Sequence, residues 1–250
     1  MGVKYKNPPI EEAVCQFTFA ENIPWGIATP GQLFERFQEH YPAEPTQQQL
    51  VQANLLNSAT GEAPSLSLVQ SPTRVQLRSE DDTRRLTVGA DLAAVHTLKP
   101  YVGFEEELLP RIKRDIAVVV AQFGVTFSRV SLRYINRINV AKATVELKDY
   151  FNYITDPIDM LPFNGVVAGF LYRTQLESPQ ERTACAVTVA SLQADPGMTS
   201  FLLDIDLTFA AAAPIDLEDA LSSLTTLKRQ ENEIFESLIT PTSRKLFNDE

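Results

Sequence analysis

The sequence has few of the residues from which metal and redox sites are built. It contains two cysteines and two histidines among 250 residues. Neither His40 nor His96 has a second histidine or a cysteine at the spacing of a zinc site, and we expect both on the surface or in loops. Cys15 and Cys185 each fall in an apolar strand pattern, which predicts reduced core thiols. No metal site is therefore predicted.

Motifs for common catalytic groups and cofactors are also missing. Gly165 to Gly169 has no Lys-Ser or Lys-Thr behind it, as a phosphate loop would require. No serine is framed as Gly-x-Ser-x-Gly. Glu11 and Glu12 are neighbours on a predicted strand, so they face opposite ways and do not share a reacting atom. We predict no catalytic residue and no cofactor, and the sequence favours a protein that is not an enzyme.

Long apolar runs are absent as well. No run approaches the ~20 residues of a membrane span, and Met1 to Lys6 lacks the apolar stretch of a signal peptide. We therefore expect a cytoplasmic protein without membrane contact. The net charge of −10 argues against non-specific nucleic-acid binding, which depends on phosphate contacts. An apolar content of 44% is ordinary for a globular protein and suffices for a sizeable core.

The most informative stretch is Phe127 to Val140, which alternates with period two. Arg129, Arg133 and Arg137 share one parity, and the other parity carries the apolar residues Val130, Leu132, Tyr134, Ile138 and Val140. This pattern predicts a long β-strand that is buried on one face and lined with guanidinium groups on the second.

The first half of the chain reads as a strand, a short helix, several strands and a long helix. Alternation predicts a strand over Ile10 to Phe19, and Thr29 is expected to cap a short helix, with Gln32 completing a capping box. The further strands are expected at about Gln48 to Leu56, Leu66 to Gln70, Arg74 to Ser79 and Arg84 to Ala90. A helix over Phe104 to Phe123 follows, which Pro110 should kink or restart.

The second half repeats this order. A short helix is predicted over Val145 to Ile154. The strands that follow are expected at Val167 to Glu177, Thr183 to Leu192 and Phe201 to Phe209, with Pro214 ending the sheet. Asp216 can cap a long final helix, and Thr240 a short terminal one.

Together these patterns predict an α+β fold with a pseudo-twofold duplication. Residues 1–125 would form the first half and residues 126–250 the second, within one compact molecule. We expect an extended antiparallel sheet with two long helices on one face. The order resembles the duplicated TATA-binding-protein-like arrangement and, less closely, helix-grip folds; this likeness is one of fold and carries no function.

Three motifs also resemble those of one protein family. They are Asn7-Pro8-Pro9-Ile10-Glu11-Glu12-Ala13, Leu132-Arg133-Tyr134-Ile135-Asn136-Arg137-Ile138 and Glu233-Ile234-Phe235-Glu236-Ser237-Leu238-Ile239-Thr240. They look like those of a sporadically distributed family of uncharacterised bacterial proteins. The resemblance implies a bacterial cytosolic protein from an accessory or mobile gene set, and it implies no activity.

The candidate binding residues lie on predicted strands. Arginine forks bind phosphate or carboxylate in a bidentate manner, and the three arginines of Phe127 to Val140 recur at roughly 13 Å. The candidate set is Arg129, Arg133, Arg137, Arg173, Asp204 and Asp206. The alternative is that the arginines pair with acids on neighbouring strands, for which Asp204, Asp206 and Glu177 are available. Asp204 and Asp206 also share a face at roughly 7 Å, but without a third ligand they predict no metal site.

Three functions are compatible with these features, the last of them an enzyme or small-ligand protein that uses a cavity between the sheet and the long helix. The first is a non-enzymatic interaction protein that docks a protein partner or a second copy of itself. The alternative is a nucleic-acid-binding protein that uses the arginine-lined sheet face. Asn136, on the core side of its strand, is expected to be structural.

Overall fold

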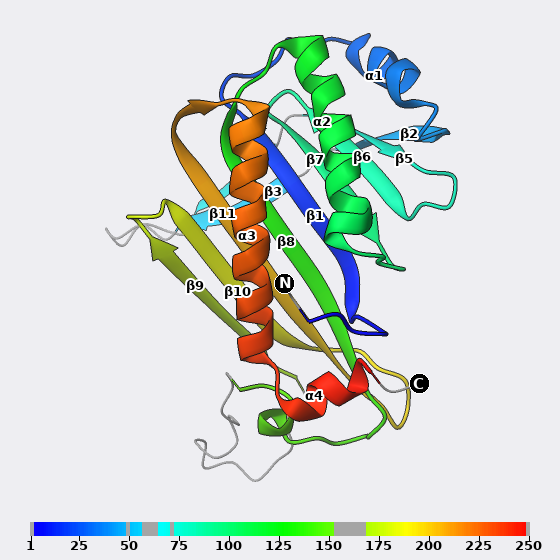
Figure 1. Cartoon of the computed structure of the whole chain (residues 1–250), viewed down its shortest axis with the longest axis vertical. Helices are drawn as coiled ribbons and strands as arrows, with labels where there is room; N and C mark the ends of the chain where they lie inside the picture. The colour runs from blue at the N-terminus through cyan, green and yellow to red at the C-terminus, as the bar shows by residue number, and fades with distance from the viewer. Residues whose placement is uncertain (1–2, 49–50, 57–64, 71–72, 153–168, 249–250) are drawn as a thin grey trace.

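A nine-stranded antiparallel sheet runs through the whole molecule (Figure 1). The computed structural model describes residues 3–48, 51–56, 65–70, 73–152 and 169–248. The strand order is β2-β5-β6-β7-β1-β8-β11-β10-β9. The strands are β1 (Ile10–Phe19), β2 (Ala43–Gln48), β5 (Arg74–Arg78), β6 (Arg84–Gly89), β7 (Leu92–Leu98), β8 (Phe127–Val140), β9 (Leu171–Ser178), β10 (Thr183–Leu192) and β11 (Thr199–Ile215). The predicted α+β fold with an extended antiparallel sheet is confirmed.

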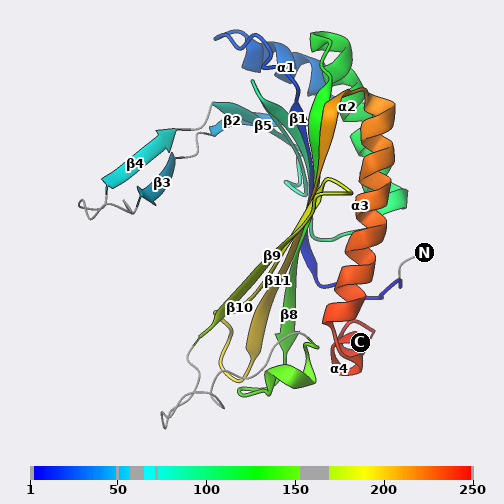
Figure 2. The same ribbon diagram turned by 90° about the vertical axis from the view of Figure 1, so that its left-hand side faces the viewer.

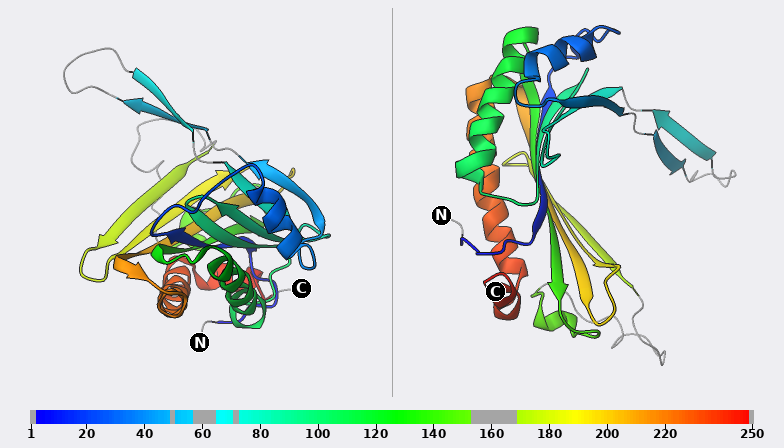
Figure 3. Two further views of the ribbon diagram at one scale, coloured as in Figure 1. Left: turned by 90° about the horizontal axis from the view of Figure 1, so that it is seen from above. Right: turned by 90° about the vertical axis from the view of Figure 1, so that its right-hand side faces the viewer.

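Helices cover only one face of this sheet. Figure 2 shows α2 and α3 on one side, and a separate hairpin of β3 (Val51–Leu56) and β4 (Ser65–Gln70) projecting on the other. The helices are α1 (Thr29–Phe37), α2 (Leu109–Phe123), α3 (Leu217–Leu238) and α4 (Pro241–Leu246). The views in Figure 3 agree with this arrangement. The opposite face of the sheet, which we call the open face, therefore carries no helix among the described residues.

Only one of the two predicted long helices is long. α3 has 22 residues, whereas α2 has 15 and follows a π-helical turn, Phe104–Leu108. Pro110 lies in the first turn of α2, where its missing N–H costs nothing, so the chain restarts there as a new helix. Gly124 ends α2 in a left-handed conformation, with φ of 65°. None of the helices in the described ranges is both long and apolar enough to cross a membrane.

The core lies between the sheet and the helices α2 and α3. β8 has the predicted bounds, and its alternation is confirmed: Leu132 and Tyr134 are fully buried, whereas Arg133 is exposed. Ile112 and Ile116 of α2 pack from the other side. This burial of one parity fixes which side chains of every strand face away from the core.

Local signals predicted two helix starts correctly and one wrongly. The Asp216 carboxylate accepts a hydrogen bond from Asp219 N at 3.0 Å, so the predicted cap of α3 is confirmed. Thr240 likewise caps α4. The prediction for Thr29 is wrong, because its hydroxyl accepts from Gly26 N at 3.0 Å and Ala28 occupies the cap position.

Other expectations needed correction. β2 and β7 were not predicted as strands. β7 is buried on nearly every residue, so it lacks alternation. The helix expected over Val145 to Ile154 is a 3₁₀ turn at Leu147–Asp149, and residues 153 and 154 lie outside the described ranges. β11 continues past Pro214 to Ile215 through a register irregularity, where a missing N–H is tolerated.

Candidate functional site

The open face carries the predicted site residues. Buried side chains of β8 and β11 face the helices, so side chains of the opposite parity point to the open face. Arg129, Arg133 and Arg137 lie there on β8, beside Asp204 and Asp206 on β11, and Arg173 lies there on β9. The structure therefore places residues from three strands on one surface.

Strand register aligns charged residues across this face. Arg78 is paired with Arg85, Arg85 with His96, and His96 with Val14. Val14 is paired with Arg133, and Arg133 with Asp206. We call this line across six strands the transverse row. At about 4.8 Å per strand it extends roughly 24 Å.

Arg133 is held by a carboxylate on the neighbouring strand. Its Nε and one terminal nitrogen donate to the two carboxylate oxygens of Asp204, at 2.8 and 2.7 Å. The Asp204 side chain is 7% exposed and that of Arg133 45%. The bidentate hydrogen bond raises the pKa of Arg133. For this arginine, the alternative of pairing with an acid on an adjacent strand is what the structure shows.

Asp206 occupies a less favourable position than Asp204. It lies directly opposite Arg133 in the register, yet the guanidinium fork turns to Asp204 instead. Burial raises the pKa of the Asp206 carboxyl, and the charges of Arg133 and Arg173 oppose this shift only in part. The folded protein therefore disfavours the ionised form of Asp206.

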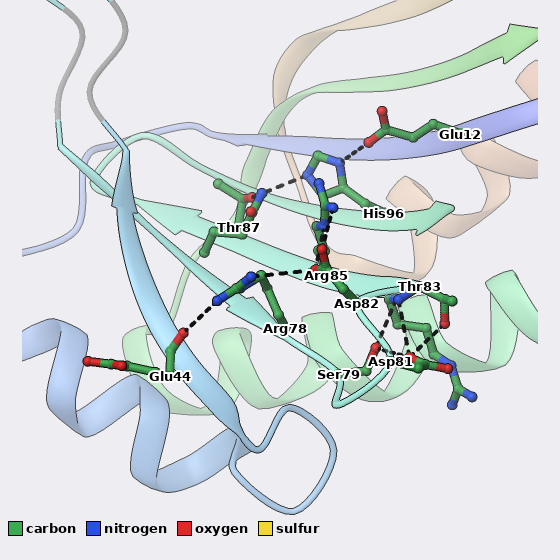
Figure 4. Close-up of polar contacts among 12 residues, drawn as sticks. Glu12, Glu44, Arg78, Ser79, Asp81, Asp82, Thr83, Arg85, Thr87 and His96 are labelled. Carbon is green, nitrogen blue, oxygen red and sulfur yellow. Dashed lines mark hydrogen bonds and ion pairs between the residues drawn. The ribbon is translucent and has the colours of Figure 1, made fainter. Parts of the chain in front are cut away.

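A second ion-pair cluster lies at the other end of the transverse row (Figure 4). Arg85 makes a bidentate pair with Asp82, at 3.0 and 2.8 Å. Arg78 lies 3.9 Å from the same carboxylate and also donates to Glu44 O at 3.3 Å. Because Arg78 and Arg85 are direct cross-strand neighbours, Asp82 separates two like charges that would otherwise repel. The hydrogen bond from Arg85 lowers the pKa of Asp82.

His96 lies between the two ends of the row. Its Nδ1 lies 2.8 Å from Glu12 Oε1 and its Nε2 lies 3.2 Å from Thr87 Oγ1. An ionised carboxylate only accepts, so Nδ1–H donates to Glu12; in the tautomer that leaves Nε2 without a proton, the Thr87 hydroxyl donates to Nε2. The hydrogen bond from His96 lowers the pKa of Glu12. His96 is not in a loop: it lies half-buried on the open face, on the unpredicted strand β7.

The order hydroxyl, imidazole and carboxylate is also that of an acyl-transfer triad. Thr87, however, is only 5% exposed, and its hydroxyl accepts from Gln76 at 3.4 Å. Its strand, β6, is paired on both sides, by β5 and β7. The backbone N–H groups around Thr87 therefore serve the sheet and do not form an oxyanion site. The contacts of Thr87, His96 and Glu12 stabilise the sheet face.

The remaining arginines of the candidate set have no carboxylate partner among the described residues. Arg137 donates to Asn139 Oδ1 at 3.1 Å and to Gln193 O at 2.9 Å. Arg173 donates to Thr188 Oγ1 at 3.3 Å. Arg129 is exposed and makes no hydrogen bond or ion pair within the described part of the chain. These three surround the paired centre of the face.

Two further predictions concern metal binding and Asn136. The ion pair with Arg133 occupies both oxygens of Asp204, and the described ranges contain no group of three or more metal-ligating side chains. Asn136 is 1% exposed and donates to Leu203 O of the adjacent strand at 3.0 Å. This contact fits the structural role expected for Asn136.

No protein-family model matches the chain, and no curated protein matches it either.

Proposed function

We propose that the protein is a non-enzymatic interaction protein that docks a protein partner on its open face. In line with the motif resemblance, we place it in an accessory or mobile gene set of a bacterium. The observation that supports the proposal is the transverse row, in which the arginines and His96 are already held by carboxylates.

A face of fixed ion pairs suits a protein surface better than a polyanion. Arg85 and Arg133 are pre-oriented by Asp82 and Asp204, so a partner meets alternating charges in fixed positions. Such patterns give specificity through complementary potentials. A phosphate meets Arg85 and Arg133 with the Nε edge of each fork already occupied by a carboxylate, so only the remaining N–H groups are open to it.

The strand order supports a duplicated, saddle-like arrangement as part of this proposal. β1 and β8 lie side by side at the centre, and each is flanked by the last strand of its own half, β7 and β11. In such an arrangement the open face would be the inner surface of the saddle. The β3–β4 hairpin projects on that side in Figure 2 and would flank a bound partner.

The test is affinity capture from the native host with matched variants. Arg133→Glu reverses a charge at the centre of the open face. Arg229→Glu makes the same change on α3, where Arg229 pairs with Glu233 on the opposite side of the molecule. We expect a protein that is retained by the wild type and by Arg229→Glu and lost with Arg133→Glu. A specific partner retained equally by both variants would refute docking on the open face.

Nucleic-acid binding is the second candidate, because Arg129 and Arg137 lack carboxylate partners among the described residues. Fluorescence anisotropy with single- and double-stranded DNA and RNA tests it at low and moderate salt. Binding that weakens with salt, and weakens again in Arg129→Ala and Arg137→Ala, would favour it over protein docking. No binding at low salt would exclude it, because electrostatic attraction is strongest there.

A further inference from the structure

The two edges of the sheet differ in how they are protected against pairing. β2, at one edge, contains Pro45 and a register irregularity between Ala43 and Thr46. Both features block the addition of another strand. β9, at the other edge, has eight residues, no proline or lysine, and an unbroken register with β10. Only the β9 edge is therefore suited to accept a further strand.

β9 also exposes apolar side chains on both of its faces. Leu171 is 68% exposed and Leu176 is 62% exposed. Because the two positions have opposite parity, they lie on opposite faces of the sheet. α3 packs on β8 and β11, and no described helix covers β9. A strand added at this edge would cover apolar surface that is otherwise in water.

The charges of β9 are complementary to those of a second β9. When two antiparallel copies are related by a twofold axis perpendicular to the sheet, each face of one sheet continues as the same face of the other. Residues that lie directly opposite each other across the new pairing must therefore both be odd-numbered or both be even-numbered. An axis that passes between the Gln175 residues of the two copies places Arg173 opposite the partner's Glu177. By symmetry, Glu177 then lies opposite the partner's Arg173. Leu176 then lies opposite the partner's Thr174. One register thus creates two cross-strand ion pairs of the stabilising kind.

Neither charge has an ion-pair partner among the residues that the structure describes. Arg173 and Glu177 are four residues apart on a strand, roughly 13 Å, which is too far for an ion pair. Glu177 has no hydrogen bond or ion pair with any residue the structure describes. Arg173 makes one hydrogen bond there, to Thr188, and acts on Asp206 only through its charge. We propose that a second copy of this chain pairs antiparallel with β9 about Gln175, forming a continuous sheet through two Arg173–Glu177 pairs.

This inference goes beyond the proposed function and does not depend on it. The open face and the β9 edge are different surfaces, so Arg133→Glu should leave the dimer intact. Loss of partner capture with the dimer retained would affect only the docking proposal, and the reverse result only the dimer.

Sedimentation velocity over a range of protein concentrations tests the dimer. We expect the wild type to dimerise, and Arg173→Glu or Glu177→Arg to weaken the dimer roughly thirtyfold, because two cross-strand pairs change sign together. The double variant Arg173→Glu/Glu177→Arg should dimerise again. The two single variants should form a heterodimer when they are mixed. At positions 173 and 177 one variant then carries two acids and the other two arginines.

The mixing experiment also excludes misfolding as an explanation, because misfolded monomers would not associate with each other specifically. Glu39→Arg, an exposed charge reversal beyond the end of α1, is the matched control and should leave the dimer unchanged. A wild type that stays monomeric at every concentration would overturn the proposal. A dimer whose affinity is unchanged by each single charge reversal would also overturn the proposal. So would a double variant that stays monomeric.

Discussion

The ion pair between Arg133 and Asp204 should be strongly asymmetric in its effect on stability. Arg133→Met leaves the Asp204 carboxylate, 7% exposed, without the two hydrogen bonds that satisfy it. We expect Arg133→Met to lower the unfolding free energy by about 2 kcal/mol. This is less than the loss for a fully buried pair, because the Arg133 side chain is 45% exposed. Asp204→Ala should cost only about 1 kcal/mol, since the released guanidinium can reach water.

Urea unfolding followed by tryptophan fluorescence measures these effects, because Trp25 is the single tryptophan. If the pair is coupled as the geometry indicates, Arg133→Met/Asp204→Ala should cost about 2 kcal/mol, less than the sum of the single changes. Arg129→Met is the control, since Arg129 lies on the same strand and face and has no ion-pair partner in the described part of the chain. It should stay within about 0.5 kcal/mol of the wild type. Strictly additive losses would refute the pairing.

Three further changes test other parts of the structure. Because burial raises the pKa of Asp206 above its unfolded value, the ionised Asp206 carboxylate lowers stability at pH 7, and this penalty disappears as pH falls through the raised value. Asp206→Asn should therefore raise the urea midpoint at pH 7 and lose this advantage near pH 4. Asp216→Ala should cost about 1 kcal/mol in the same assay, whereas Asp216→Ser should retain the cap. Lys228 Nζ lies 2.6 Å from Glu231 Oε2, and Glu231 is 4% exposed, so Lys228→Met should lower the unfolding free energy by about 3 kcal/mol. The double variant Lys228→Met/Glu231→Leu should regain most of this free energy, because no unpaired carboxylate stays buried.

Signals carried by neighbouring residues were predictable. The bounds of β8, its arginine face and the caps of α3 and α4 depend on side chains within a few positions of one another. Period-two alternation is visible wherever one face of a strand is buried and the other is in water. β7 escaped prediction because it is buried on both faces, and His96 was missed with it. The cap predicted at Thr29 is wrong because the Thr29 hydroxyl accepts a hydrogen bond from the backbone N–H of Gly26.

The sequence by itself determined the α+β class, the central strand and the parity of its arginines. Only the tertiary structure decided which arginines are paired. Arg133 and Asp204 are 71 positions apart, and Glu12 and His96 are 84 positions apart. Strand order and register, which depend on packing across the whole sheet, bring these charges together. The same long-range order makes β2 and β9 the two edges, so the exposed edge at β9 could not be identified from local pattern.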